Sequence, residues 1–257
     1  MLDLQLDDAV IAITGGASGI GAACARAFAQ QGAVVALLDK NFAASEALAE
    51  SLHSDGCPAL AVEVDVADDQ SCRLAIEKAL NWRGKIDSLI CCAGISGPVG
   101  KTIIEMQSQA WQQVIAVNLN GLFNIARYTI PSLEQSHIAS LVILASDSSF
   151  LAYPGMAPYS AAKGGSLMLT KALAVDHPKL RVNCICPSVV DTPMSRADLG
   201  LTAQDLQNAG FPVVAPSQIA NHVLFAASPA SAPMNGAAVI VDFGYMAKPS
   251  FPQPDFI

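Results

Sequence analysis

Continuous apolar runs alternate with stretches typical of helices along most of this chain. The runs cover residues 9–14, 34–38, 59–64, 86–92, 141–145, 181–186 and 237–241, and the predicted helices cover 22–31, 45–55, 68–82, 108–136 and 159–175. Short strands that are apolar throughout are buried on both faces, as in a parallel sheet covered by helices. The pattern therefore predicts an α/β fold with a doubly wound parallel sheet and helices on both faces. Because no linker or break in composition divides residues 1–257, we expect a single domain.

The first two apolar runs enclose a glycine-rich turn and a helix. The turn, Gly15-Gly16-Ala17-Ser18-Gly19-Ile20-Gly21, follows the first run directly, and Asp39 closes the second. Glycines let the backbone approach a pyrophosphate, while the helix N-terminus supplies N–H groups and a positive dipole. This arrangement is typical of a Rossmann-type dinucleotide site. Asp39 can accept hydrogen bonds from both ribose hydroxyls and repels a 2′-phosphate, so we expect NAD; Lys40 leaves NADP as the alternative.

A tyrosine and a lysine stand four residues apart in the helix predicted for 159–175. At this spacing Tyr159 and Lys163 lie one turn apart on the same face. An ammonium beside a phenol lowers the pKa of the phenol, which can then exchange a proton with an alcohol or carbonyl oxygen near neutral pH. The spacing by itself is also compatible with a solvated surface pair.

Six ordered motifs between Thr14 and Gly244 resemble those of the short-chain dehydrogenase/reductase family. They are Thr14-Gly15-x-x-x-Gly19-Ile20-Gly21, Asp65-Val66, Asn118, Ser146 at 13 residues before Tyr159, and the segments 187–194 and 241–244. The resemblance implies a Rossmann-type fold and hydride transfer between a nicotinamide cofactor and an alcohol or ketone. It also implies a homo-oligomer, either a dimer or, more often, a tetramer. Apolar residues of the two predicted helices around Trp111 and Leu167 agree with pairing to a second subunit.

The resemblance assigns roles to individual residues. Tyr159 is the acid or base, Lys163 lowers its pKa and holds the nicotinamide ribose, Ser146 donates a hydrogen bond to the substrate oxygen, and Asn118 holds a water that links Lys163 to solvent. Ser146 as a strand-end cap and Asn118 as an ordinary polar residue of a helix remain alternatives. The residues expected to bind the cofactor are Gly15, Ser18, Gly19, Ile20, Gly21, Asp39, Asp65, Val66, Cys92, Ala93, Gly94, Tyr159, Lys163, Pro187, Val190 and Thr192.

The sequence departs from the family pattern after the fourth apolar run. The family commonly has Asn-Asn-Ala-Gly there, and this chain has Cys91-Cys92-Ala93-Gly94. Asparagine side chains brace the sheet by hydrogen bonds that a thiol makes only weakly. We therefore expect the sheet to be held differently at this point or to be less stable. Ser188 and Phe243 replace two further family glycines.

Composition and charge narrow the classes of protein. The chain of 257 residues is 52% hydrophobic and 14% charged, with a net charge of −8, which disfavours nucleic acid and anionic membranes as partners. No apolar run reaches membrane-spanning length and the N-terminus lacks a basic flank, so we expect a soluble, cytoplasmic protein. The seven cysteines and four histidines lack metal-site spacing, so we expect reduced thiols and no metal.

The sequence therefore predicts an NAD-dependent oxidoreductase that interconverts a small or medium secondary alcohol and its ketone. The alternatives are a 3-oxoacyl-thioester reductase that uses NADPH and a non-catalytic NAD-binding protein. We expect a lid at about 194–213, in which Arg196 either grips a substrate carboxylate or is a surface cation. Without a certain cation the pocket favours a neutral substrate. Its expected walls are Ser96, Ser148, Phe150 and Met194, together with Ile95 and Val189.

Overall fold

The computed structural model describes residues 3–247, and in it seven parallel strands form one sheet in the order β3-β2-β1-β4-β5-β6-β7. The bounds are β1 Val10–Thr14, β2 Val34–Asp39, β3 Ala59–Glu63, β4 Ser88–Cys91, β5 Ser140–Leu144, β6 Arg181–Pro187 and β7 Ala238–Val241. Every neighbouring pair is parallel, and Ile11 of β1 aligns with both Val35 of β2 and Ser88 of β4. The predicted doubly wound parallel sheet is confirmed.

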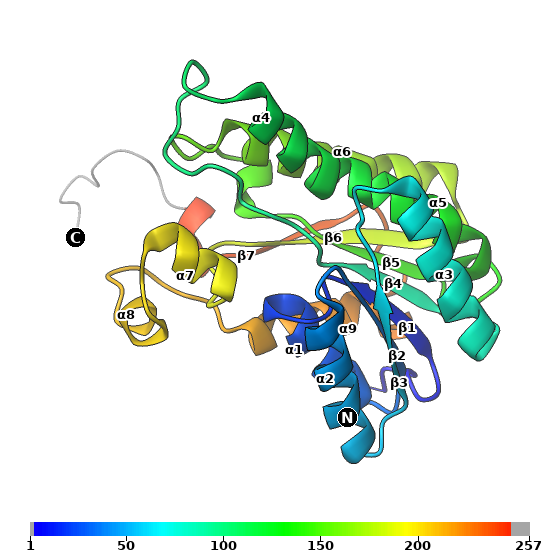
Figure 1. The fold of residues 1–257 in the computed structure, drawn as a ribbon. Coiled ribbons are helices and arrows are strands. Elements are labelled where there is room, and N and C mark those ends of the chain that lie inside the picture. Colours follow the sequence, from blue (N-terminus) through cyan, green and yellow to red (C-terminus); the bar gives the residue numbers. More distant parts are fainter. Residues whose placement is uncertain (1–2, 248–257) are drawn as a thin grey trace, which may run out of the picture.

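Helices cover both faces of this sheet (Figure 1). On one face lie α1 Gly19–Ala29, α2 Phe42–Ser54 and α9 Pro216–Ala227, and on the other lie α3 Asp69–Arg83, α5 Gly121–Leu133 and α6 Ala157–Asp176. Helix α4 (Ser108–Ile115) packs on α6, and the short helices α7 (Pro193–Leu199) and α8 (Ala203–Gln207) lie together beside the sheet, in yellow in Figure 1. Three-residue 3₁₀ turns are η2 (Asp147–Ser149), η3 (Pro229–Ser231) and η4 (Tyr245–Ala247).

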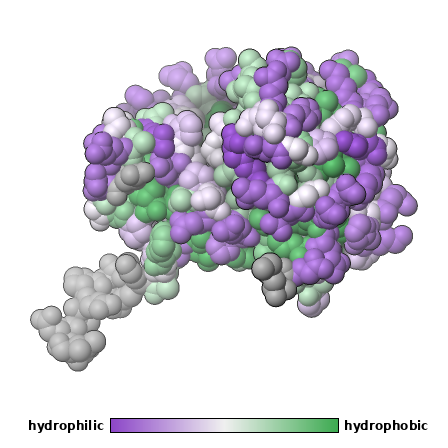
Figure 2. Space-filling view, turned by 90° about the horizontal axis from the view of Figure 1, so that it is seen from below, coloured by the Kyte–Doolittle hydropathy of each residue, from purple (hydrophilic) through white to green (hydrophobic). Residues whose placement is uncertain are grey.

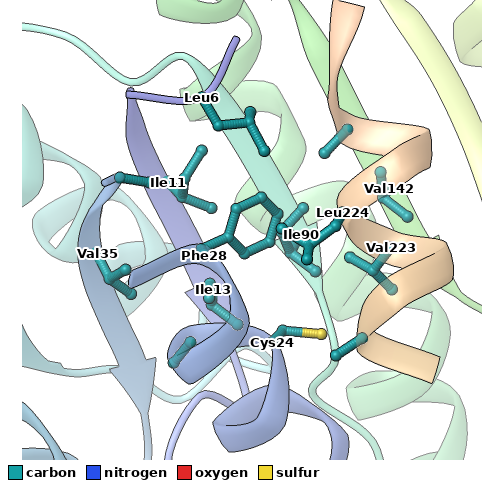
Figure 3. Packing of buried hydrophobic residues seen from close by; sticks show 14 of the residues in the cluster. Leu6, Ile11, Ile13, Cys24, Phe28, Val35, Ile90, Val142, Val223 and Leu224 are labelled. Atoms are coloured by element: carbon teal, nitrogen blue, oxygen red, sulfur yellow. The ribbon is translucent and has the colours of Figure 1, made fainter. Parts of the chain in front are cut away.

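The strand residues alternate between two apolar cores because successive side chains of a strand point to opposite faces. In β1, Ile11 and Ile13 join the core under α1, α2 and α9, whereas Ala12 joins the core under α3, α5 and α6. Phe28 of α1 is completely buried and lies at the centre of the first core, between the strands and α9 (Figure 3). Both faces are therefore dry, which explains why the strands are apolar throughout.

Two parts of the chain differ from the sequence prediction. Helix α9 was not predicted, although Ile219, Val223 and Leu224 bury one face of it against the sheet. The stretch predicted as helical over 108–136 ends at Leu133 and is interrupted by a π-helical turn, η1 (Ala116–Asn120). A π-helical turn inserts one extra residue into the helical ladder and is frequent at functional sites. Here it contains Asn118.

The outer surface shows both polar and apolar groups. Hydrophilic residues cover much of the face seen in Figure 2, which views the molecule from below Figure 1. On α5 and α6, by contrast, Phe123 and Met168 are large exposed apolar side chains. That the chain pairs with a second subunit through these helices stays a prediction. Within residues 3–247, no helix combines the length and apolar character that crossing a membrane needs.

Candidate active site

The strand order reverses between β1 and β4, which are neighbours in the sheet. In open α/β sheets, ligands bind at such a switch point, outside the carboxyl ends of the strands. Those ends carry several of the predicted residues: Gly15 follows β1, Asp39 ends β2, Cys92 follows β4, Ser146 follows β5 and Pro187 ends β6. The topology thus gathers residues that are far apart in the sequence.

The glycine turn after β1 is shaped for close backbone approach. Gly15 adopts a φ of 63°, and a Cβ at this position would come within 2.7 Å of the amide nitrogen of Ala93. A Cβ on Gly21 would overlap the carbonyl oxygen of Gly15. Helix α1 then begins at Gly19, and the side chain of Ser18 makes no capping bond to it. Free N–H groups and this hydroxyl can therefore face an anion such as a pyrophosphate.

Asp39 lies where the ribose of a dinucleotide is expected. Its carboxylate accepts hydrogen bonds from the amides of Ala17 and Asn41, at 3.0 and 2.9 Å, one on each oxygen. Each oxygen has a further lone pair for a ribose hydroxyl. Lys40 is turned toward Asp65, with 2.6 Å between the ammonium and the carboxylate. This contact lowers the pKa of Asp65 and raises that of Lys40.

Two adjoining cavities of about 520 and 460 Å³ run along this edge of the sheet. They share Ile20, Cys92, Gly94, Thr192 and Met194, so they form one groove. The first cavity extends to Asp39 and Asp65, and the second extends to Ser146, Tyr159 and Lys163. Every residue predicted from the sequence to bind the cofactor lines one of the two cavities.

Tyr159 and Lys163 both face the second cavity from α6, one turn apart, so they are not a solvated surface pair. The Lys163 ammonium is 5.6 Å from the centroid of the Tyr159 ring and donates a hydrogen bond of 2.6 Å to the carbonyl oxygen of Leu144. Lys163 is buried. Removal from water disfavours its charged form, and burial lowers the pKa of Lys163 to about 8.

The expectation that Lys163 lowers the pKa of Tyr159 stays a prediction, because burial of the phenol outweighs any such effect in the site as the structure has it. The pKa of Tyr159 is raised to about 12, and burial of the phenol is the largest cause of this rise. The Ser146 hydroxyl acts to lower this pKa, while the carboxylates of Asp147 and Asp198 raise it. The lysine ammonium is bonded to Leu144 rather than to the phenol, so desolvation dominates.

Ser146 and Asn118 are both placed by side-chain hydrogen bonds. The Ser146 oxygen accepts a bond of 3.1 Å from the Ser148 amide and donates one of 2.9 Å to Asp147. The Asn118 side chain accepts from the Ile95 amide and donates to the Ile95 carbonyl, both at 2.8 Å. Both groups of the side-chain amide therefore fix the loop after β4, and each keeps one further hydrogen or lone pair that can bind a water. That role stays a prediction.

The predicted substrate residues are mostly, but not all, at the second cavity. Ser96, Ser148 and Met194 line it, as does Val189, whereas Ile95 lines the first cavity. Phe150 lines neither cavity and is 44% exposed, so the structure contradicts its placement as a wall. It directly follows η2 in the chain.

Asp147 lines the second cavity and was not singled out from the sequence. Tyr153 ends the stretch 148–153, which the sequence also places at the substrate, and Asp198 lies in the expected lid. Tyr153 donates a hydrogen bond of 2.8 Å to Asp147, and Asp198 of α7 accepts one from the Ser96 hydroxyl. Asp147 directly follows Ser146, so its proximity to the predicted serine was the available signal. The Arg196 side chain is bonded to Asp191 at 2.6 Å, which supports its interpretation as a surface cation of the lid.

Cys91, the last residue of β4, and Cys92, which follows it, occupy two different environments. Cys91 is buried in the sheet, and Cys92 lines both cavities. Main-chain bonds brace β4 here: the Cys92 amide donates to the Thr14 carbonyl at 3.0 Å, and the Ala93 amide donates to the Thr14 hydroxyl at 3.3 Å. All seven cysteines lie in the described part of the chain and none is in a disulfide. Among residues 3–247, no group of three potential ligands could hold a metal ion.

Together, the fold and the groove define a dinucleotide-binding α/β protein with a tyrosine, a lysine and a serine in an adjoining cavity. Comparisons with known proteins agree. A family model described as enoyl-(acyl carrier protein) reductase matches residues 15–246. The chain is 34% identical to 2-(S)-hydroxypropyl-CoM dehydrogenase 3 of Xanthobacter autotrophicus, over 95% of this chain and 98% of that one. It is 32% identical to meso-2,3-butanediol dehydrogenase of Serratia marcescens, over 97% and 99%.

A solved structure supports the same conclusion. The 3-ketoacyl-(acyl-carrier-protein) reductase of Brucella melitensis, complexed with NADH, is 30% identical and superposes with a TM-score of 0.84, covering 93% of this chain and 99% of that one. The chain belongs to the short-chain dehydrogenase/reductase family. It is an oxidoreductase of this family.

Proposed function

We propose that this protein uses NAD to interconvert a small or medium neutral secondary alcohol and its ketone. The observation that carries the proposal is the joining of two cavities, one ending at Asp39 and the other at Tyr159. A dinucleotide laid along the groove has its adenosine ribose at Asp39 and its nicotinamide beside Tyr159, Lys163 and Ser146. The glycine turn and the carboxylate of Asp39 fit such a ligand.

The chain's own residues supply the proton path and the position. When bound, the nicotinamide accepts a hydride from the carbinol carbon or returns one to the carbonyl carbon. Tyr159 takes the hydroxyl proton during oxidation and gives it back during reduction. The Lys163 ammonium lies beside the tyrosine and the expected place of the nicotinamide ribose, so that it fixes the position of Tyr159 relative to the cofactor. Ser146 bonds to the substrate oxygen, where charge develops.

The charges around the second cavity favour a neutral substrate. Asp147 and Asp198 place carboxylates at the cavity, and the Arg196 guanidinium is bonded to Asp191. A carboxylate-bearing substrate would meet these charges without a free partner, and an unpaired charge in a dry site is costly. The relatives named for a diol and for a hydroxypropyl group agree with an alcohol substrate.

The test compares two substrates that differ only at one end, 1,3-butanediol and 3-hydroxybutanoate, by following the absorbance of reduced nicotinamide. We expect the diol to give the higher kcat/KM, by roughly 10- to 100-fold, because the acid carries an unpaired charge. Arg196→Ala should leave this ratio unchanged. A higher kcat/KM for 3-hydroxybutanoate than for the diol in the wild type, with the difference lost in Arg196→Ala, would refute the neutral-substrate proposal. Arg196 would then be a substrate ligand.

A 3-oxoacyl-thioester reductase remains the second candidate, because the Brucella melitensis structure carries a name of that class. Asp39 and the net charge of −8 speak against it, since that activity usually draws on NADPH and a basic docking surface. This candidate would be favoured if acetoacetyl thioesters are reduced with NADPH at a higher rate than any free ketone is reduced with NADH. No turnover with any alcohol, ketone or thioester, together with NAD binding, would instead favour a non-catalytic NAD-binding protein.

Asp39→Ala should narrow the preference for NAD over NADP. The substitution removes the carboxylate that bonds the ribose hydroxyls and repels a 2′-phosphate. The measurement is the ratio of kcat/KM with the two cofactors, which cancels any general damage from the lost bonds to Ala17 and Asn41. Asp55→Ala, in the turn after α2, is the matched control and should leave the ratio unchanged. If the wild type already prefers NADP, the role of Asp39 is refuted and Lys40 becomes the candidate.

A further inference from the structure

Asp147 is a buried carboxylate in the wall of the second cavity that the proposed mechanism does not use. It is 3% exposed and begins η2, directly after Ser146. Carboxylates are rarely buried to this degree unless they are bonded. Two hydroxyls provide the bonds: Ser146 Oγ lies 2.9 Å from Asp147 Oδ1, and the Tyr153 hydroxyl lies 2.8 Å from Asp147 Oδ2.

The direction of these bonds follows from the chemistry of the groups. An ionised carboxylate only accepts hydrogen bonds, so each hydroxyl must donate its hydrogen to Asp147. The amide of Ser148 also donates to Ser146 Oγ, at 3.1 Å. While Tyr159 is a phenol, the single hydrogen of Ser146 therefore points to Asp147, and the serine has only a lone pair to offer the cavity. Ser146 lowers the pKa of Tyr159 only where this hydrogen turns to the phenolate.

This arrangement treats an alcohol and a ketone differently. Before its proton moves to Tyr159, an alcohol can donate its hydroxyl hydrogen to the free lone pair of Ser146 while Ser146 stays bonded to Asp147. A ketone has no hydrogen to donate, so Ser146 must give up its charge-assisted bond to Asp147 before it can donate to the carbonyl oxygen. Hydrogen bonds to an ionised acceptor are roughly twice as strong as neutral ones, so this exchange costs free energy.

We propose that Asp147 is a positioning residue that holds the Ser146 hydrogen out of the cavity, so that the free site binds the alcohol in preference to the ketone. Asp147 acts through Ser146 and does not touch the substrate. The bond to Ser146 yields only when negative charge develops on the substrate oxygen, which then competes with Asp147 for the hydrogen. The proposal rests on the function proposed above, in which Ser146 bonds to the substrate oxygen.

The first variant is Asp147→Asn, measured in both directions with 2,3-butanediol and its ketone, acetoin. An amide oxygen is a neutral and weaker acceptor of nearly the same shape, so Ser146 can turn to the ketone more easily. We expect the KM for acetoin to fall by about tenfold relative to the KM for the diol. A variant cannot change the reaction equilibrium, so with unchanged constants for NAD and NADH the ratio of the two kcat values must change to compensate. Asp176→Asn, at the far end of α6, controls for the loss of one charge and should leave the KM ratio unchanged.

A second variant makes the test independent of the folding of the first. Tyr153→Phe removes the other hydrogen-bond donor to Asp147, which should then hold the Ser146 hydrogen more strongly. We expect the KM ratio to move the opposite way, with weaker acetoin binding. A purely structural role for Asp147 would change both KM values alike, whether or not the melting temperature falls. That result, or two variants that move the KM ratio in the same direction, would overturn the proposal.

Failure of this proposal can be told from failure of the proposed function. Ser146→Ala and Tyr159→Phe are assayed with the same two substrates. If either keeps wild-type turnover, the assignment of the reacting groups is wrong and the proposal about Asp147 falls with it. If both lose turnover while Asp147→Asn keeps the wild-type KM ratio, the proposed function stands and only the proposal about Asp147 is refuted.

Discussion

Replacing Tyr159 with phenylalanine is expected to reduce kcat by roughly 10² to 10⁴-fold, the contribution typical of a general acid or base. The substitution removes only the hydroxyl, so the ring still fills its place between Lys163 and the cavity. Cofactor affinity, measured by fluorescence titration with NADH, should stay close to that of the wild type, because the ring of residue 159 is kept and only the hydroxyl that carries the proton is lost. A rate loss without an affinity loss is the signature of a group that acts on the proton alone.

The matched control is Tyr128→Phe. Tyr128 lies on α5 and donates its hydroxyl to Asp69, outside both cavities. Tyr128→Phe removes the same hydroxyl group as Tyr159→Phe and should leave kcat unchanged. If Tyr159→Phe loses less than tenfold, the proton goes through another group, and the cavity residues with exchangeable protons, Tyr153 above all, become the candidates.

The sequence predicted the strands and the cofactor cavity because both are determined locally. A strand buried on both faces must be mostly apolar, and the polar residues of β1, β2 and β5 are Thr14, Asp39 and Ser140, each at a strand end. The glycine turn, α1 and Asp39 belong to one βαβ unit, so their mutual positions follow from a short piece of chain. In parallel sheets the strand ends then bring Cys92 and Ser146 to the same edge.

The parts that could not be predicted depend on contacts between distant elements. Helix α9 is amphipathic, but proline and small residues surround it, and only its packing on α1 reveals the buried face. The pKa of Tyr159 depends on how deeply the cavity is buried and on Asp198 of α7, which a spacing of four residues does not reveal. Asp147 begins a short 3₁₀ turn and Phe150 directly follows it. The sequence alone does not show which of these side chains faces the cavity.

The buried lysine is where function and stability are expected to conflict. Lys163→Met removes the ammonium while keeping an unbranched side chain, and it should reduce both kcat and NADH affinity, because Lys163 serves the proton path and the nicotinamide ribose. Each effect is measured as for Tyr159→Phe, by steady-state rates and by fluorescence titration. Lys171→Met, farther along α6 and exposed, is the matched control. Loss of rate alone, or of affinity alone, would divide the role assigned to Lys163.

The free energy of unfolding should also depend on pH differently in the wild type and in Lys163→Met. Burial lowers the pKa of Lys163 from 10.5 to about 8, so the unfolded chain binds more protons than the folded protein between these values. Stability therefore rises with pH in this window by about 3 kcal/mol in the wild type relative to Lys163→Met. Below pH 8 the lysine is charged in both states and its full cost is present, and above pH 10.5 that cost is gone. Urea unfolding of both proteins at pH 7, 9 and 10.5 measures the difference. Parallel curves would mean that Lys163 keeps its ordinary pKa in the folded protein and that the site is wetter than the structure indicates.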